Sequence, residues 1–178
     1  MLFRSNPAEI ETAIRGKGTW HSYVELHIEQ GGSLDKAKVP IGIVEGIVGI
    51  HRYEVVIEGM TNHAGTTPMN ERHDAMVAAS SLTLAVRDIA SRRQGRQVGT
   101  VGRIEIEPNS PNVIPGRATL SIEFRDLSVA TLRELGDAIK ARAAEIAKDT
   151  GTAITFTLAG TNEPAMATGG VQIGRAHV

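Results

Sequence analysis

The chain has 178 residues, of which 41% are hydrophobic and 3% aromatic, so any core must be built from Ala, Val, Ile and Leu. The formal net charge is −1, which argues against the basic surface of a nucleic-acid-binding protein. There is no cysteine, which excludes disulfides and thiolate metal sites and fits a reducing compartment. No apolar run reaches the roughly 20 residues of a membrane-spanning helix, and the N-terminus lacks the apolar core of a signal peptide. We therefore expect a cytoplasmic protein that binds neither nucleic acid nor membrane.

Two stretches in the first fifty residues have strand character. Residues 22–29 alternate, with apolar side chains at every second position and polar side chains, among them His27, between them. Residues 41–50 are apolar and interrupted by glycines, which is typical of a buried strand with bends. Between the two predicted strands, Gln30 and the two glycines after it indicate a turn.

A regular succession of strands and helices follows. Alternating apolar residues predict strands, and apolar residues at helical spacing predict helices. The predicted elements are a strand from His51, a helix over 71–93, strands over 99–107 and 118–125, a helix after Ser128 and a strand around 154–158. This βαββαβ order predicts an α/β fold of the α+β type. We expect a ferredoxin-like domain over 51–160, whose four-stranded antiparallel sheet carries both helices on one face.

His27 and His63 are candidate functional histidines. His27 lies on the polar face of its predicted strand between Glu25 and Glu29, where it could bind a metal. A single histidine on a strand is more often structural, and no nearby group completes a metal site. His63 lies in the loop N-H-A-G-T-T-P, whose small residues leave the imidazole accessible as an electrophile or substrate contact. The alternative is a loop histidine that only hydrogen-bonds to backbone groups.

Asn112 and Arg125 form a third candidate. Asn112 lies in the loop before the strand that carries Arg125, and an amide together with a planar guanidinium would suit an acidic small molecule. The alternative is a surface arginine in a weak ion pair with Asp126 or a neighbouring glutamate. The sequence holds no G-x-G-x-x-G, no phosphate loop and no G-x-S-x-G elbow, so a Ser/His/Asp hydrolase has no local support.

Four motifs occur in a fixed order along the chain. They are E-L-H-I-E-Q-G at 25–31, N-H-A-G-T-T-P-M at 62–69, R-H-D-A at 72–75, and N-V-I-P-G followed by E-F-R-D within 112–126. In this order and spacing they resemble the hydantoinase/carbamoylase family of amidases, and the similarity runs from about Trp20 to about Pro164. Members of that family include N-carbamoyl-L-amino-acid hydrolases, allantoate amidohydrolases and metal-dependent β-ureidopropionases. The family belongs to the di-zinc aminoacylase and carboxypeptidase superfamily.

The resemblance implies a two-domain subunit. A lid domain of the βαββαβ kind, 51–160 here, would be inserted into an α/β catalytic domain with a two-metal site and would make the homodimer contact. Residues 1–50 would then be a truncated part of the catalytic domain, and 161–172 the return towards it. Ile173 to Val178 match what a common sequencing adapter encodes before a stop codon, so we expect an artefact there rather than an ordinary tail. Genomic DNA that encodes I-G-R-A-H-V would contradict this.

The resemblance also implies roles for five residues. His27 matches a metal ligand, Gln30 a substrate-contacting glutamine, and His63 a catalytic and substrate-binding histidine that polarises the scissile carbonyl. Asn112 and Arg125 match residues that hold the substrate carboxylate. Some of these groups would complete the site only after domain closure or from the partner subunit. The family's other ligands (a His, a bridging Asp, a Glu beside the catalytic Glu, and a later His) have no counterpart here. The chain alone is therefore expected to be inactive and to bind no metal stably.

The parent protein is thus predicted to be a metal-dependent amidohydrolase that cleaves the linear C–N bond of N-carbamoyl-L-amino acids. We expect it to use zinc, manganese or cobalt and to form a homodimer through the lid. An allantoate amidohydrolase, or a related peptidase or aminoacylase, is the alternative within the superfamily. A stand-alone dimerisation or ligand-binding module is the alternative of another class, although truncated strands with open apolar edges argue against it.

Overall fold

The structure, a computed structural model, describes residues 7–21 and 24–167. These residues form two units. The first unit comprises the described residues up to Ile43, and the second unit is Val44–Ala167. Within the described ranges, no helix is both long enough and apolar enough to cross a membrane. The segment 173–178, for which we expect an adapter origin, lies outside the described residues.

The first unit has little regular structure. A 3-10 helix, η1, spans Pro7–Ala13, and one short helix, α1, spans Ser33–Ala37. The strand predicted over 22–29 is wrong for its described part, because residues 24–29 form no strand and their apolar side chains are exposed. A strand needs a neighbour to pair its backbone groups, and no strand among the described residues pairs with this segment.

The buried strand predicted over 41–50 is also only partly present. Residues 41–45 form no strand, and only Gly46–Ile47 (β1) and the first residues of the next strand are extended and paired. β1 pairs antiparallel with β8, Ala165–Met166, which lies just before the C-terminal end of the second unit. A two-residue pair covers neither face, so Ile41, Ile43 and Ile47 stay exposed.

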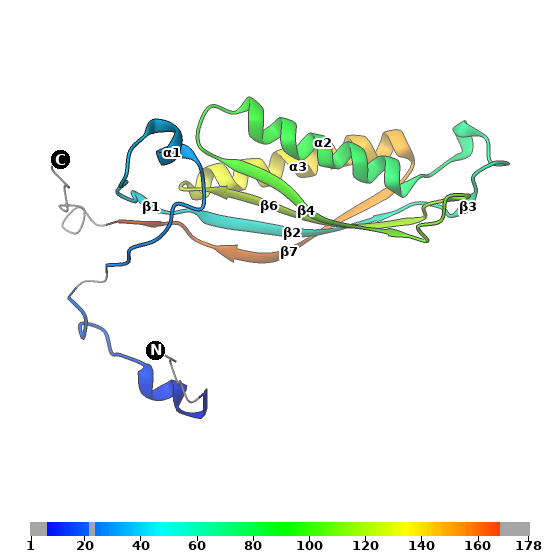
Figure 1. Cartoon of the computed structure of the whole chain (residues 1–178). Coiled ribbons are helices and arrows are strands. Elements are labelled where there is room, and N and C mark those ends of the chain that lie inside the picture. The colour runs from blue at the N-terminus through cyan, green and yellow to red at the C-terminus, as the bar shows by residue number, and fades with distance from the viewer. Residues whose placement is uncertain (1–6, 22–23, 168–178) are drawn as a thin grey trace. The chain divides into compact units, whose positions relative to one another are not determined.

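A four-stranded antiparallel sheet forms the body of the second unit (Figure 1). Its strands are β2 (Gly49–Glu58), β4 (Val98–Glu107), β6 (Arg117–Asp126) and β7 (Ala153–Asn162), in the order β4-β6-β2-β7. β2 and β6 are central and pair along their whole lengths, from Gly49 opposite Asp126 to Glu58 opposite Arg117. This order, with a helix in each crossover, confirms the predicted ferredoxin-like arrangement.

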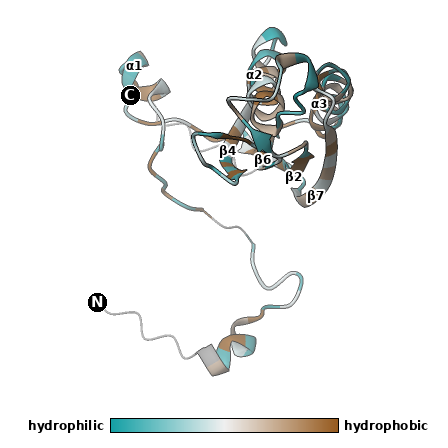
Figure 2. Cartoon of the chain, turned by 90° about the vertical axis from the view of Figure 1, so that its right-hand side faces the viewer, coloured by the Kyte–Doolittle hydropathy of each residue, from teal (hydrophilic) through white to brown (hydrophobic). Residues whose placement is uncertain are grey.

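Both long helices lie on the same side of the sheet, as Figure 2 shows. α2 spans Ala75–Arg92 and begins after Asp74, whose side chain accepts hydrogen bonds from two backbone N–H groups of the first turn. It therefore starts four residues later than the predicted Glu71. α3 spans Val129–Thr150, is capped by Ser128, and ends at Gly151 with a left-handed φ of 65°.

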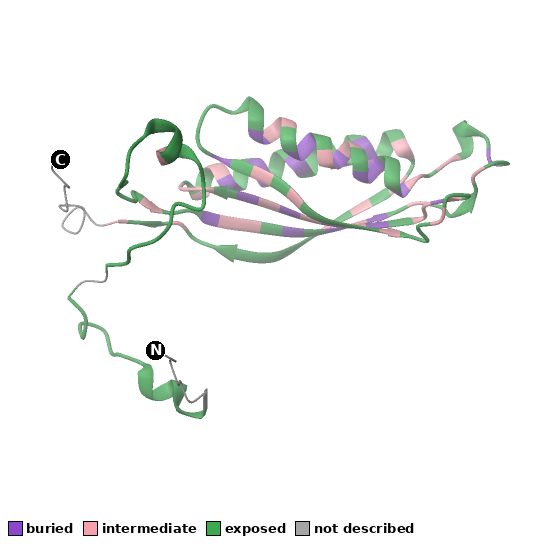
Figure 3. Cartoon of the chain, in the orientation of Figure 1, coloured by how far each residue is buried: buried purple, intermediate pink, exposed green. Residues whose placement is uncertain are grey.

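The core lies between the helices and the sheet (Figure 3). Because successive strand residues point to opposite faces, each central strand sends one set of side chains into this core. The fully buried set includes Val55, Ile57, Leu120, Ile122 and Phe124 from the sheet, and Leu82, Val86, Leu132 and Ile139 from the helices. The alternate residues, mostly arginine, glutamate and threonine, point away from the helices and form what we call the open face of the sheet.

Three short elements continue past one end of the sheet. β3 (Asn62–His63) follows β2, η2 (Met69–Glu71) precedes α2, and β5 (Val113–Ile114) precedes β6. They extend beyond the end where Glu58 and Arg117 are paired, which we call the distal end. The proximal end is the opposite one, where Ile50 pairs with both Arg125 and Asn162 and where the chain enters and leaves the second unit.

Candidate functional site

His63 and Asn112 lie side by side at the distal end. β3 and β5 pair antiparallel, with His63 opposite Val113. The backbone N–H of Ala64 donates to the carbonyl of Asn112 at 2.9 Å. Both side chains are exposed. Two loops that are about fifty residues apart in the sequence are therefore joined by backbone hydrogen bonds, and their polar side chains form one group, the distal pair.

The hydrogen bonds of the His63 ring fix which nitrogen carries the proton. The backbone N–H of Gly65 donates to Nδ1 at 3.1 Å, and the hydroxyl of Thr66 lies 3.2 Å from the same nitrogen. A backbone N–H can only donate, so Nδ1 must be the bare acceptor and the proton of the neutral ring must reside on Nε2. His63 thus presents an Nε2–H donor, which suits a carbonyl oxygen that gains negative charge.

Arg72 holds the loop that carries His63. Its Nη2 donates to the carbonyls of Ala64 at 2.6 Å and Thr67 at 2.9 Å, and its Nε donates to Thr67 at 3.1 Å. The Thr67 hydroxyl in turn donates to the carbonyl of His63 at 2.8 Å. The sequence reasoning quoted the motif R-H-D-A but gave Arg72 no role. Arg72 lies nine residues after the histidine, and its role depends on contacts across the loop that the motif itself does not indicate.

The Asn112 side chain is oriented by its neighbour Ser110. The hydroxyl of Ser110 donates to Oδ1 of Asn112 at 2.8 Å. Because Oδ1 accepts this bond, the amide NH₂ remains as the donating end of the side chain. The distal pair therefore offers two neutral donors, the amide of Asn112 and the Nε2–H of His63.

Arg125 lies at the other end of the sheet from Asn112. It pairs with Ile50 at the proximal end, eight residues along β6 from Arg117. At about 3.3 Å per residue, this separation is roughly 26 Å. The structure therefore does not bring Asn112 and Arg125 together within one subunit, although the sequence reasoning treated them as one candidate. The loop before β6 and the last residues of β6 lie at opposite ends of the sheet, because an extended strand joins them.

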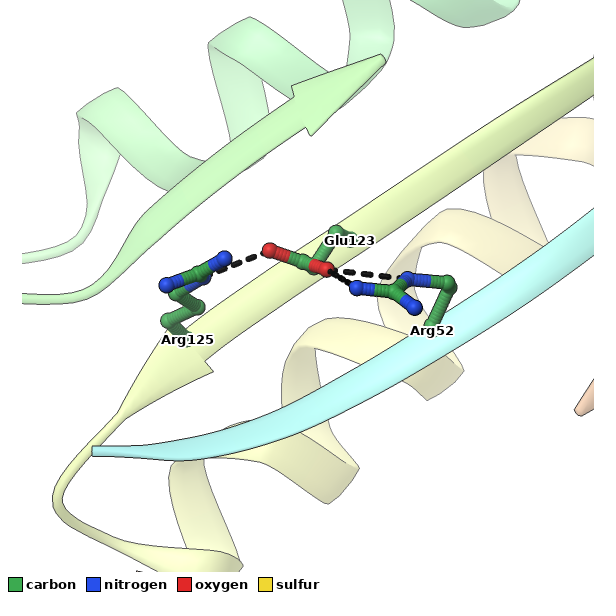
Figure 4. Close-up of polar contacts among 3 residues, drawn as sticks. All are labelled: Arg52, Glu123 and Arg125. Carbon is green, nitrogen blue, oxygen red and sulfur yellow. Dashed lines mark hydrogen bonds and ion pairs between the residues drawn. The ribbon is translucent and has the colours of Figure 1, made fainter. Parts of the chain in front are cut away.

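The ion-pair partner of Arg125 is Glu123, not Asp126. Its Nε donates to Oε1 of Glu123 at 2.5 Å, and Arg52 binds the other carboxylate oxygen through Nε, at 2.9 Å, and Nη2 (Figure 4). Burial by itself would raise the pKa of the Glu123 carboxyl, but the hydrogen bonds and charges of Arg52 and Arg125 lower the pKa below its ordinary value. Glu123 is therefore a stable anion between two cations.

These three residues line a groove of about 800 Å³ on the open face. The other lining groups come from β2, β4, β6 and β7 and are mostly polar: Glu54, Val98, Thr100, Gly102, Arg103, Ser121 and Ala159. The groove carries charged and hydroxyl side chains because the strand residues that alternate with the core residues line it. It offers guanidinium and hydroxyl donors to a polar, acidic ligand.

His27 and Gln30 belong to the first unit and are placed only within it. Nδ1 of His27 lies 2.5 Å from the carbonyl oxygen of Ile28. A carbonyl only accepts, so Nδ1 carries the proton and Nε2 keeps its lone pair, which is the form in which a histidine binds a metal. Gln30 has a left-handed φ of 53° in the turn that precedes α1. The carboxylate of Glu29 accepts from the backbone N–H groups of Ser33 and Leu34.

The donor set fits a metal only in part. His27 has the tautomer that a metal ligand needs, but the described ranges 7–21 and 24–167 hold no cluster of three or more His, Cys, Asp or Glu side chains that could bind an ion. A closed zinc site takes about four ligands and a catalytic one about three. The described residues thus supply one suitable ligand.

Comparison with known proteins identifies the relatives of this chain. Residues 46–151 match the model of the peptidase dimerisation domain. The chain is 41% identical over 150 residues to the N-carbamoyl-L-amino acid amidohydrolase of Geobacillus stearothermophilus, covering 84% of this chain and 36% of that protein. It is 43% identical over 113 residues to the allantoate amidohydrolase of Escherichia coli (strain K12), covering 64% and 28% respectively.

A solved structure agrees. The amidase of the hydantoinase/carbamoylase family from Burkholderia multivorans superposes with a TM-score of 0.79 at 34% identity, over 82% of this chain and 36% of that one. The chain thus spans about a third of the length of these relatives. Over that third, fold, sequence and domain model agree: the chain belongs to the hydantoinase/carbamoylase family of amidases and carries its peptidase dimerisation domain.

Proposed function

We propose that this chain is the dimerisation-domain portion of a metal-dependent amidohydrolase that cleaves the linear C–N bond of N-carbamoyl-L-amino acids. The observation that carries the proposal is the separation of two binding groups on one sheet. The distal pair offers neutral hydrogen-bond donors, and the proximal end offers Arg125. A ureido acid has two matching features, a neutral carbonyl that is attacked and a carboxylate that anchors it.

The distal pair would act on the carbonyl. Attack on a ureido carbonyl places negative charge on its oxygen, and preorganised neutral donors aimed at that oxygen stabilise the transition state more than the ground state. The Nε2–H of His63 is such a donor, because its loop is held by Arg72 and its tautomer by Gly65. The amide of Asn112 beside it would donate to the same end of the substrate or to its carboxylate.

Arg125 would hold the substrate carboxylate. Its Nε is engaged by Glu123, and the two terminal nitrogens form a fork that matches a carboxylate.

Gln30 would contact the substrate from the catalytic part, and His27 would be one of the metal ligands. Zinc, manganese or cobalt, when bound, would supply Lewis-acid activation of the carbonyl and of water. The absence of cysteine fits a reducing, cytoplasmic compartment.

We further propose that the protein is a homodimer and that the two binding groups of one subunit serve different active sites. Arg125 lies at the end of the sheet where the chain enters and leaves the second unit, while the distal pair lies roughly 26 Å further along the sheet. A ureido acid is far too short to span that distance. His63 and Asn112 would therefore reach the site of the partner subunit.

The dimer surface that the structure favours is α2 with the adjacent edge strand β4. α2 carries no charged residue from Ala75 to Val86, and Met76, Val77 and Leu84 are exposed on it. Ile104 is exposed on β4, where it lies opposite the core residue Leu120, and the outer edge of β4 is unpaired among the described strands. Exposed apolar side chains grouped in this way are typical of an interface, and the matching domain model is a dimerisation domain.

The test is substrate turnover by the full-length gene product reconstituted separately with zinc, manganese and cobalt. Release of ammonia from a panel of N-carbamoyl-L-amino acids is the expected result. Allantoate belongs in the same panel, because the 43% identity to an allantoate amidohydrolase makes it the second candidate substrate. Turnover of allantoate alone would move the assignment to that activity, and no turnover of any panel member would refute the proposed substrate class.

A further inference from the structure

Glu123 is shared by two arginines on the open face (Figure 4). Arg52 lies directly opposite it in the pairing of β2 with β6, and Arg125 follows two residues later on the same face of β6. The Glu123 side chain is 18% exposed, whereas those of Arg52 and Arg125 are 51% and 46% exposed. The carboxylate thus lies deeper than either guanidinium, and both cations reach inward to it.

The ratio of arginines to carboxylates in this cluster is the reverse of the ratio in the other ion-pair clusters on the same face. Arg103 lies between Glu54, at 3.1 Å, and Glu105, at 3.7 Å. At the distal end, Arg117 likewise lies between Glu58, at 3.5 Å, and Glu107, at 3.7 Å. Each of these arginines has two carboxylates, whereas Glu123 has two arginines. Among the ion pairs described on the open face, the surplus of positive charge therefore lies at Arg52, Glu123 and Arg125.

We propose that Glu123 and Arg52 are positioning residues for Arg125, which together prepare a site for the carboxylate of a ureido acid. Glu123 binds Nε and so fixes the plane of the guanidinium, leaving both terminal nitrogens for a bidentate contact. Arg52 compensates the charge of Glu123, so that the ordered Arg125 still presents a net cation. Because it concerns how Arg125 meets its ligand, this inference rests on the function proposed above.

Arg52 is tested by ligand binding to the 178-residue chain. N-carbamoyl-L-methionine and its methyl ester are titrated at millimolar concentration and followed by amide chemical shifts. Arg52→Met should weaken binding of the acid by about threefold or more, and leave binding of the ester unchanged. Arg103→Met is the matched control, since Arg103 lines the same groove, is 49% exposed, and its loss removes the same charge. Unchanged affinity in Arg52→Met, or equal losses in both variants, would overturn the role of Arg52.

Glu123 is tested by the Nε–H resonance of Arg125, assigned through Arg125→Lys. In the unaltered chain and in Arg52→Met, this proton should exchange slowly with water. In Glu123→Gln it should exchange about tenfold faster, because the charge-assisted hydrogen bond is lost. Equal exchange rates in Glu123→Gln and the unaltered chain would overturn the positioning role.

The two measurements separate this inference from the proposed function. An unaltered chain that binds the acid no better than the ester would refute the carboxylate role of Arg125, and with it the role of Arg52. The exchange rate of the Arg125 Nε–H would still decide whether Glu123 positions that side chain.

Discussion

Nδ1 of His63 accepts the backbone N–H of Gly65 at 3.1 Å, so the ring of the candidate catalytic histidine is held by a residue two positions along the same loop. A Cβ added to Gly65 would lie 3.1 Å from Cε1 of His63. The glycine therefore has two functions here. It supplies the N–H that selects the tautomer, and it leaves room for the ring to approach the backbone.

The first prediction concerns this tautomer. Long-range ¹H–¹⁵N spectra of the neutral His63 ring should show a protonated Nε2 and a bare Nδ1. Gly65→Ala should displace the ring and change both ¹⁵N shifts. Gly102→Ala is the control, because a Cβ there would meet nothing within 4 Å. A neutral His63 protonated on Nδ1 in the unaltered chain would contradict the assigned donor.

The second prediction concerns Arg72, whose guanidinium donates three hydrogen bonds to two loop carbonyls. Arg72→Lys keeps the charge but loses the fork, and should lower the free energy of unfolding by about 1–3 kcal/mol. It should also speed proteolysis between Ala64 and Met69. Arg142→Lys is the control, because Arg142 forms an ion pair with Glu145 on the exposed surface of α3. Urea unfolding that shows equal losses in the two variants would contradict the clamp.

The third prediction concerns Gly136 in α3. On an exposed helix, Gly→Ala stabilises by roughly 0.5–1 kcal/mol. Here a Cβ would lie 2.3 Å from the hydroxyl oxygen of Tyr53 and 3.2 Å from its Cζ. Gly136→Ala should therefore destabilise the second unit by about 1–3 kcal/mol, because the helix must move off the sheet. Thermal unfolding measures the sign, and a stabilised Gly136→Ala variant would refute the close approach.

The fourth prediction concerns pH. The arginines on either side of Glu123 outweigh its burial and lower the pKa of its carboxyl below 4.5 in the folded chain. A lowered folded pKa means that the stabilisation is fully present above about pH 4.5 and is lost as the pH falls through the folded pKa. The stability lost in Glu123→Gln, measured by urea unfolding, should therefore be larger near neutral pH than at about pH 3. A loss that does not vary with pH would contradict this.

The fifth prediction concerns the dimer. Leu84 is 61% exposed on the uncharged stretch of α2. Leu84→Glu should shift the chain from dimer towards monomer in light scattering, because a charge would be buried at the interface. Ala144→Glu adds the same charge to an exposed position of α3 and serves as the control. Dissociation by Ala144→Glu instead would place the interface on the other helix.

Sequence periodicity was sufficient for the βαββαβ unit because each strand there buries one face and each helix one stripe. Val55 and Ile57 of β2 follow this alternation and are fully buried. The same alternation at Val24, Leu26 and Ile28 predicted a strand that the structure does not show. Periodicity reports which faces could be buried, and burial also requires a partner surface, which lies beyond the local sequence.

The candidate site was predictable residue by residue but not as a geometry. His63 and Asn112 were identified from their loops, yet only the pairing of β3 with β5 shows that they are neighbours. Arg125 was expected to act with Asn112, and the direction of β6 separates them. The roles of Arg72 and Glu123 depend on contacts across loops and strands, so no local motif could have indicated them.

Subunit complementation in the full-length enzyme is the most direct test of the proposal that one subunit's binding groups serve two active sites. His63→Ala and Arg125→Ala should each be nearly inactive as homodimers. When the two variants are mixed and allowed to exchange subunits, each heterodimer holds one intact site, so activity should recover to about a quarter of that of the unaltered enzyme. Mixed subunits that exchange but remain as inactive as the separate variants would show that His63 and Arg125 of the same chain serve one site.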